Sequence, residues 1–170
     1  MPLEIERKFL VVLDRLPVEA LGPGARFAQG YLSLQPTVRV RLAVQPGIPE
    51  AAWITVKGPG GLRRAEYEYA IPPEHAREML GLCVAALDKT RYHLRVGDHV
   101  WDVDAFHGRY DGLWVAEVEL GADDEPFVRP PWAGDEVTGD ARYTNAALAL
   151  AATVKVRDGR LVDDPGDGTG

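Results

Sequence analysis

Residues 3–9 read LEIERKF, and this short stretch decides the fold. Glu4, Glu6 and Lys8 are spaced two residues apart, with apolar residues such as Ile5 in the same run. Side chains on a β-strand alternate between two faces, so the three charged residues share one face. The stretch therefore predicts a strand with one charged face and one largely apolar face.

The same alternation recurs along the chain, in runs separated by turns that contain Gly and Pro. Same-sign charges two residues apart occur in the segments EIE, RVR, EYE, KTR, DVD and EVE. Such short alternating runs are typical of antiparallel strands. The predicted strands cover residues 3–12, 26–34, 37–44, 52–58, 65–72, 87–96, 99–106 and 113–120.

An ordinary sheet with one face in water would also alternate polar and apolar residues. Its solvent face usually mixes neutral polar residues with opposite charges, whereas like charges repeat within the strands here. Like charges repel weakly in water and strongly when enclosed, so we interpret the repeats as lining an interior. The predicted fold class is mainly β (α+β): an antiparallel eight-stranded barrel or tunnel, or an open clamp, with a charged lumen and a few short outer helices.

Helical segments are few. The spacing of apolar residues, with Pro at the start, predicts a helix over 73–82, and an Ala- and Leu-rich segment predicts another over 144–152, capped by Asp140 or Thr144. A chain of 170 residues fits one domain, which we place over 1–152. Residues 153–170 are polar, Gly-rich and acidic, and we expect a disordered tail.

Composition narrows the classes of partner. The formal net charge is -7, from 19 Lys+Arg against 26 Asp+Glu, which argues against nucleic acid or an anionic membrane as a partner. We expect a cytoplasmic protein, because no apolar run is long enough to span a bilayer and the charged start does not resemble a signal peptide. The lone Cys83 excludes an internal disulfide and a cysteine-based zinc cluster. The oligomeric state is open, a homodimer being one option.

The two kinds of charge repeat suit two parts of one ligand. The guanidinium groups of Arg bind phosphate oxygens through two parallel hydrogen bonds, and the ammonium groups of Lys bind them through their charge. Paired carboxylates bind Mg²⁺ or Mn²⁺, which prefer oxygen ligands. An enclosed lumen that holds both is tolerable when water, metal ions and an anionic ligand complete it. The pattern therefore predicts a site for a metal-bound phosphate compound.

The opening motif Glu4-x-Glu6-x-Lys8 resembles the signature of the CYTH superfamily, the triphosphate tunnel metalloenzymes. Further segments follow in family order over about the first 150 residues. They are RVRL (39–42), TVKG (55–58), LRRAEYE (62–68), KTRY (89–92), DVDAF (102–106), VAEVEL (115–120) and EVTGDARYTNAALA (136–149). The similarity is closest to short bacterial members that hydrolyse inorganic triphosphate.

The resemblance implies a tunnel that grips a triphosphate together with divalent metal ions. The basic repeats would bind the phosphates, and the carboxylates would hold the metal. The implied phosphate-binding residues are Arg39, Arg41, Lys57, Arg64, Lys89 and Arg91. The implied metal ligands are Glu4, Glu6, Asp104, Glu117 and Glu119. Catalytic roles are implied for Lys8, beside the reacting phosphoryl group, and for Glu4 and Lys89.

Our hypothesis is in-line attack on a terminal phosphorus by a water activated on one of two Mg²⁺ or Mn²⁺ ions, which yields pyrophosphate and phosphate. Two alternatives stay open. The first is a hydrolase or cyclase acting on an organic triphosphate such as ATP or thiamine triphosphate, which needs a pocket for the organic group. The second is a noncatalytic module that binds polyphosphate. Such a module would not need the metal-binding glutamates, all of which are present in this sequence.

Overall fold

The computed structural model describes residues 3–60, 63–151 and 154–164, with the backbone alone for Leu3 and Glu4. The strands within these residues are β1 (Leu3–Val11), β2 (Ala25–Leu34), β3 (Thr37–Gln45), β4 (Ile48–Lys57), β5 (Arg63–Ile71), β6 (Ala85–Val96), β7 (His99–Phe106), β8 (Trp114–Glu119), β9 (Ala133–Glu136), β10 (Val154–Arg157) and β11 (Arg160–Asp163). The helices are α1 (Pro73–Leu80) and α2 (Asn145–Leu150), with 3-10 turns η1 (Leu13–Arg15), η2 (Val18–Ala20), η3 (Gly108–Tyr110) and η4 (Ala141–Tyr143).

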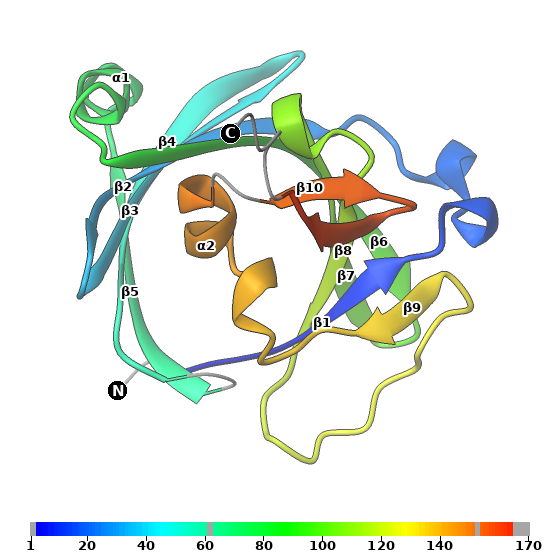
Figure 1. Cartoon of the computed structure of the whole chain (residues 1–170). Coiled ribbons are helices and arrows are strands. Elements are labelled where there is room, and N and C mark those ends of the chain that lie inside the picture. The colour runs from blue at the N-terminus through cyan, green and yellow to red at the C-terminus, as the bar shows by residue number, and fades with distance from the viewer. Residues whose placement is uncertain (1–2, 61–62, 152–153, 165–170) are drawn as a thin grey trace, which may run out of the picture.

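Strands β1 to β8 form a closed antiparallel barrel, seen as a ring in Figure 1. The sheet runs β5-β4-β3-β2-β6-β7-β8-β1, and β1 also pairs with β5 through Leu3↔Ala65 to Ile5↔Arg63, which closes the ring. The short strand β9 pairs with the far end of β1. The predicted eight-stranded fold is confirmed, in its closed form rather than as an open clamp.

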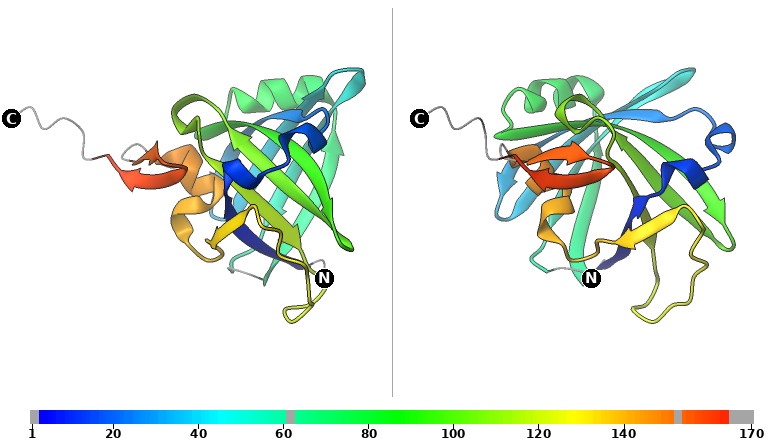
Figure 2. Two further views of the ribbon diagram at one scale, coloured as in Figure 1. Left: turned by 90° about the vertical axis from the view of Figure 1, so that its right-hand side faces the viewer. Right: turned by 45° about the vertical axis from the view of Figure 1, so that its right-hand side comes forward.

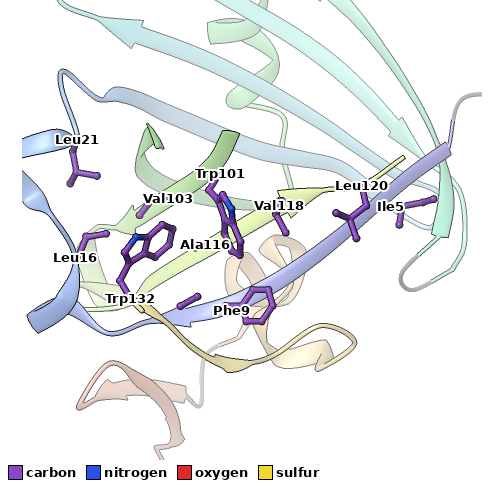
Figure 3. Close-up of a cluster of buried hydrophobic side chains, with 11 residues drawn as sticks. Ile5, Phe9, Leu16, Leu21, Trp101, Val103, Ala116, Val118, Leu120 and Trp132 are labelled. Carbon is purple, nitrogen blue, oxygen red and sulfur yellow. The ribbon is translucent and has the colours of Figure 1, made fainter. Parts of the chain in front are cut away.

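The main hydrophobic cores lie outside the barrel wall. Phe9, Trp101 and Val118 point outward from β1, β7 and β8, and the chain around Leu16 and Trp132 covers them (Figure 3). The rings of Phe9 and Trp101 are 5.5 Å apart between centroids, and Trp101 packs edge-on against Trp132 at 5.4 Å. On the other side, α1 covers the outward-facing apolar residues of β3 and β4. The lumen is thus left for polar residues.

One end of the lumen is sealed by apolar side chains. On the lumen face, Lys8 is followed by Leu10, Lys89 is preceded by Leu87, and Asp104 is followed by Phe106. These three apolar residues pack in one cluster with residues of η4, α2 and β11, namely Tyr143, Leu148 and Leu161. The apolar seal therefore lies directly beyond the innermost charges of the lumen.

Both predicted helices form, each slightly shorter than expected. Thr144 caps α2 by accepting a hydrogen bond from the Ala147 amide at 3.1 Å, and Asp140 caps the preceding turn η4. None of the described helices has the length and apolar character needed to cross a membrane.

The prediction of a disordered tail from residue 153 is wrong for residues 154–163, which form the hairpin β10–β11. The hairpin is ordered because Leu161 is buried against the barrel end, a contact that the polar composition of the segment does not reveal. Residues 153 and 165–170 of the predicted tail, and the predicted domain boundary at 152, lie outside the described residues.

Replacing Trp101 by alanine should lower the free energy of unfolding by about 3–5 kcal/mol, because a fully buried ring leaves a cavity in the outer core. Urea denaturation of wild type and variant measures the change. Val44→Ala, at an exposed position on β3, is the matched control and should alter stability little. Equal losses in the two variants would contradict the assignment of this core.

Candidate active site

Two adjoining cavities occupy the lumen. The larger has a volume of about 410 Å³ and the smaller about 320 Å³. Glu6, Arg39, Lys57 and Asn145 line both, so the cavities meet at these side chains. Acidic residues of β1, β5, β7 and β8 face the larger cavity, whereas Lys8 and Arg64 face the smaller one.

Arg39 and Arg41 form a basic wall on β3. Arg39 is 5% exposed, and its Nε has no hydrogen-bond partner among the described residues. Its NH2 group donates to Thr55 Oγ1 at 3.3 Å and lies 3.6 Å from Glu68 Oε2. Burial and the nearby Arg39 and Arg91 lower the pKa of Arg41 to about 9. Like charges thus lie close together in this wall, and an anion bound there would relieve their repulsion.

Carboxylates gather where β1, β8 and β7 run side by side. Glu6 lies opposite Glu119 in the β1–β8 register, and Glu117 lies opposite Asp102 in the β7–β8 register. All four face the larger cavity. Burial alone would raise the pKa of Glu117, but Lys8, Arg91 and Lys89 hold it well below its ordinary value. Glu117 is therefore ionised at neutral pH.

Lys8 stands between the carboxylates and the segment that closes the smaller cavity. Its Nζ lies 3.3 Å from Glu117 Oε1 and donates to the Tyr143 carbonyl oxygen at 3.1 Å. Burial alone would lower the pKa of Lys8, but Glu117 and Glu6 raise it above its ordinary value. A charged ammonium is thus fixed beside the cavity.

Asp104 organises a buried network behind the lumen. It accepts hydrogen bonds from Lys89 Nζ at 2.6 Å and from Arg91 Nε and NH2 at 2.8 and 2.9 Å. Lys89 Nζ also donates to Asn145 Oδ1 at 3.1 Å. Burial alone would raise the pKa of Asp104, but Arg91 and Lys89 lower it to about 2. Burial lowers the pKa of Lys89 despite its neighbour Asp104.

The carboxylate oxygens of Glu6, Glu117 and Glu119 suit a hard divalent cation such as Mg²⁺ or Mn²⁺. Among the described residues, which exclude the Glu4 side chain, no three His, Cys, Asp or Glu side chains converge as a ready-made ligand set. Mg²⁺ usually keeps several waters and binds through one or two carboxylates together with substrate phosphates. The donor set therefore fits a cation whose shell is completed by a phosphate ligand.

Residues 2–146 match the family model described as CYTH domain. The chain belongs to the CYTH domain family. A protein of Acetivibrio thermocellus named inorganic triphosphatase is 40% identical over 148 residues, covering 85% of this chain and 92% of the relative. An inorganic triphosphatase of Nitrosomonas europaea is 38% identical over 159 residues, covering 87% and 97%. A crystal structure of an inorganic triphosphatase aligns with a TM-score of 0.57 at 33% identity, covering 89% of this chain and 97% of that chain.

Most of the predicted site residues of this CYTH chain do converge on the lumen. Those that line a cavity are Glu6, Lys8, Arg39, Arg41, Lys57, Arg64, Arg91, Glu117 and Glu119. The Glu4 side chain lies outside the described residues, although its backbone pairs opposite Arg64. Lys89 and Asp104 line neither cavity. The catalytic role of Lys89 and the metal-binding role of Asp104 stay predictions. In the structure Lys89 and Arg91 both donate to Asp104, which holds Arg91 in place.

Several lining residues were not among the predicted site residues. Asp102 and His93, whose Oδ1 and Nδ1 atoms are 2.8 Å apart, share the lumen face with residues that were predicted, so strand parity could have included them. Asn145 enters from α2, which no strand pattern indicates. Tyr31 is 2% exposed and faces the smaller cavity, where its hydroxyl accepts from Gln29 Nε2 at 3.3 Å.

Asp104→Asn should lower the free energy of unfolding by about 3–5 kcal/mol at pH 7, because it leaves buried cations without their counter-charge. The pKa of Asp104 is lowered from 3.8 to about 2, so its contribution is fully present above pH 3.8 and is lost as the pH falls through about 2. The difference in the free energy of unfolding between wild type and variant, measured by urea denaturation, should therefore decrease as the pH falls from 3.8 to about 2.

Asp88→Asn is the matched control, because Asp88 pairs with Arg26 on the surface and its loss should change stability little. If Asp104→Asn lowers the free energy of unfolding no more than the control does, the network does not stabilise the fold.

Proposed function

We propose that this protein hydrolyses inorganic triphosphate to pyrophosphate and phosphate with the help of divalent metal ions. The observation that carries the proposal is the enclosed lumen in which basic and acidic side chains face the same two adjoining cavities. The inorganic triphosphatases at 38–40% identity support it, since each aligns over more than 90% of its own length.

The substrate is proposed to lie across the residues that the cavities share. Arg39 and Lys57 would contact its phosphates from β3 and β4, Arg41 and Arg91 from the larger cavity and Arg64 from the smaller one. Phosphoryl transfer needs little covalent chemistry from the protein, so fixed positive charge around the phosphates provides most of the rate enhancement. The Nε of buried Arg39, which has no hydrogen-bond partner within the described part of the chain, is a donor that can bind a phosphate oxygen.

Glu6, Glu117 and Glu119 are the proposed metal ligands, with Glu4 as a further one. A divalent ion held there would neutralise phosphate charge and lower the pKa of a bound water. We propose Mg²⁺ or Mn²⁺ because the available donors are carboxylate oxygens, and two ions in all as the resemblance of the sequence implies. Lys8, fixed between Glu117 and the Tyr143 carbonyl, would place its ammonium beside the reacting phosphoryl group.

A cytoplasmic location, the absence of nucleic acid and membrane partners, and a homodimer as one option for the assembly stay predictions of the sequence.

An organic triphosphate is the main alternative substrate. Among the described residues that line the cavities, the aromatic rings are those of Tyr31, which is almost fully buried, and His93, which is exposed but paired with Asp102. Stacking of a base on an aromatic side chain contributes about 1–3 kcal/mol, and the described lining offers no exposed Phe, Tyr or Trp ring for it. This favours the inorganic compound.

The variants Glu6→Gln, Arg41→Ala and Lys8→Ala should each lower the rate of phosphate release from triphosphate by about 100-fold with Mg²⁺ present, because each removes a charge next to the phosphates or the metal. Chelation of divalent ions from the wild type should abolish the release, and added Mg²⁺ or Mn²⁺ should restore it.

Arg77→Ala is the matched control for these variants. Arg77 makes an exposed ion pair with Glu50 on the outside of the barrel, so the control should keep the wild-type rate. Unchanged rates in all three lumen variants would end the proposal.

A substrate panel tests the alternative. The ratio kcat/KM for triphosphate should exceed those for ATP and thiamine triphosphate by about tenfold or more, since the one exposed ring among the described lining residues, that of His93, is already paired with Asp102. Phosphate release is measured for each compound, and the ATP reaction is also assayed for a cyclic product. A preference for either organic compound would favour the alternative, and binding without any turnover would favour a noncatalytic module.

A further inference from the structure

The turn between β10 and β11 has the sequence Asp158-Gly159, which favours a hairpin. Asp158 and Gly159 both have positive φ, 51° and 72°, in a two-residue connection between paired strands. Two-residue hairpin turns with positive φ favour Asp-Gly, because this backbone matches the twist of the strands. In this register the Leu161 amide points away from β10, toward the rest of the molecule.

Packing against the barrel end stabilises this hairpin, since an isolated two-stranded hairpin is marginally stable in water. Leu161 is 5% exposed and joins the apolar seal that contains Leu10 of β1 and Leu148 of α2. Arg160 forms an ion pair with Asp135 of β9. Figure 2 shows the hairpin beside α2, at one end of the barrel. The hairpin thus completes the seal from outside.

Tyr143 connects the hairpin to the lumen. Its hydroxyl accepts a hydrogen bond from the Leu161 amide at 3.1 Å, and its carbonyl oxygen accepts one from Lys8 Nζ at 3.1 Å. The ring between these two groups is buried, with 4% of the residue exposed. The Lys8 ammonium is therefore shared between Glu117 and a carbonyl whose residue is held by the hairpin.

The helix that follows Tyr143 is fixed on the same side. Leu148 O accepts from the Tyr110 hydroxyl at 2.6 Å and from Arg109 NH2 at 2.9 Å. At the start of the helix, Asn145 accepts from Lys89. Two lumen-side lysines thus contact a segment of three residues that packs against the hairpin.

We propose that the hairpin β10–β11 is a positioning element of the site, which holds Tyr143 so that its carbonyl fixes the Lys8 ammonium. The hairpin acts through Tyr143, so its own residues are not catalytic. The proposal rests on the proposed function only for the effect of Lys8 on turnover. Its structural part concerns the position of one ammonium group and is measurable without any reaction.

Lysine-selective isotope labelling and NMR test that part, because the chain has four lysines, Lys8, Lys57, Lys89 and Lys155. The variants are Tyr143→Phe, which removes the hydroxyl acceptor, and Leu161→Ala, which weakens the seal. Val162→Ala is the matched control, on the same strand but with its side chain on the opposite face. The Lys8 ammonium signal should shift and exchange faster with water in both variants, while the Lys57 signal and the control stay unchanged.

Turnover of triphosphate gives the second readout. Both variants should lower kcat of the folded enzyme about fivefold to tenfold, with KM within about twofold. Tyr143→Phe removes a hydrogen bond of ordinary strength and Leu161→Ala weakens the packing that holds the same amide in place, and both changes act on positioning rather than on substrate capture. A purely structural hairpin would lower the melting temperature but leave kcat and the Lys8 signal unchanged, which would overturn the proposal. A moved Lys8 signal in an enzyme whose wild type releases no phosphate would refute the proposed function while leaving the positioning role intact.

Discussion

The contact on which the lumen depends is the shared carboxylate of Asp104. Three hydrogen bonds from Lys89 and Arg91 converge on it at 2.6–2.9 Å, with almost no exposure to water. An unpaired ion at this depth would cost several kcal/mol, whereas this arrangement satisfies an anion and two cations together. Because Asp104 anchors Arg91 on its inner side and Asp102 holds it from the cavity side at 3.2 Å, the guanidinium faces the lumen in one orientation.

Filling the lumen with charge forces the hydrophobic core elsewhere. Small barrels usually pack side chains inside, but here Trp101, Phe9 and the residues under α1 pack against the outer wall. Loops and helices that look peripheral in sequence therefore contribute the apolar burial that keeps the ring closed. The seal around Leu10 and Phe106 is a place where the lumen face itself becomes apolar, and burial beside it disfavours the charged form of Lys89.

Strand parity was enough to predict the barrel and most of the lining, because a sheet face in water rarely repeats like charges two residues apart in strand after strand. Parity cannot predict how far along the barrel axis a side chain lies. Asp102 and Asp104 share a face of β7, yet Asp102 lines the cavity and Asp104 is buried behind it. Depth follows from how the strands are staggered around the barrel, which depends on pairings far apart in sequence. The hairpin was missed for another reason, since its Asp-Gly turn signal was present but lay within a polar, acidic segment whose composition suggested disorder.

The basic side chains that are proposed to bind the phosphates also repel one another. Arg39 and Arg91 disfavour the charged form of Arg41, and the buried Nε of Arg39 lacks a partner among the described residues. A protein of net charge -7 thus holds several positive charges close together on one wall of its lumen. A polyanion that enters relieves this repulsion and supplies the missing acceptor, while its own charge repels the carboxylates at the other wall unless a cation lies between them. An anion and a cation bound together would therefore balance both walls, whereas an anion alone would face the carboxylates directly.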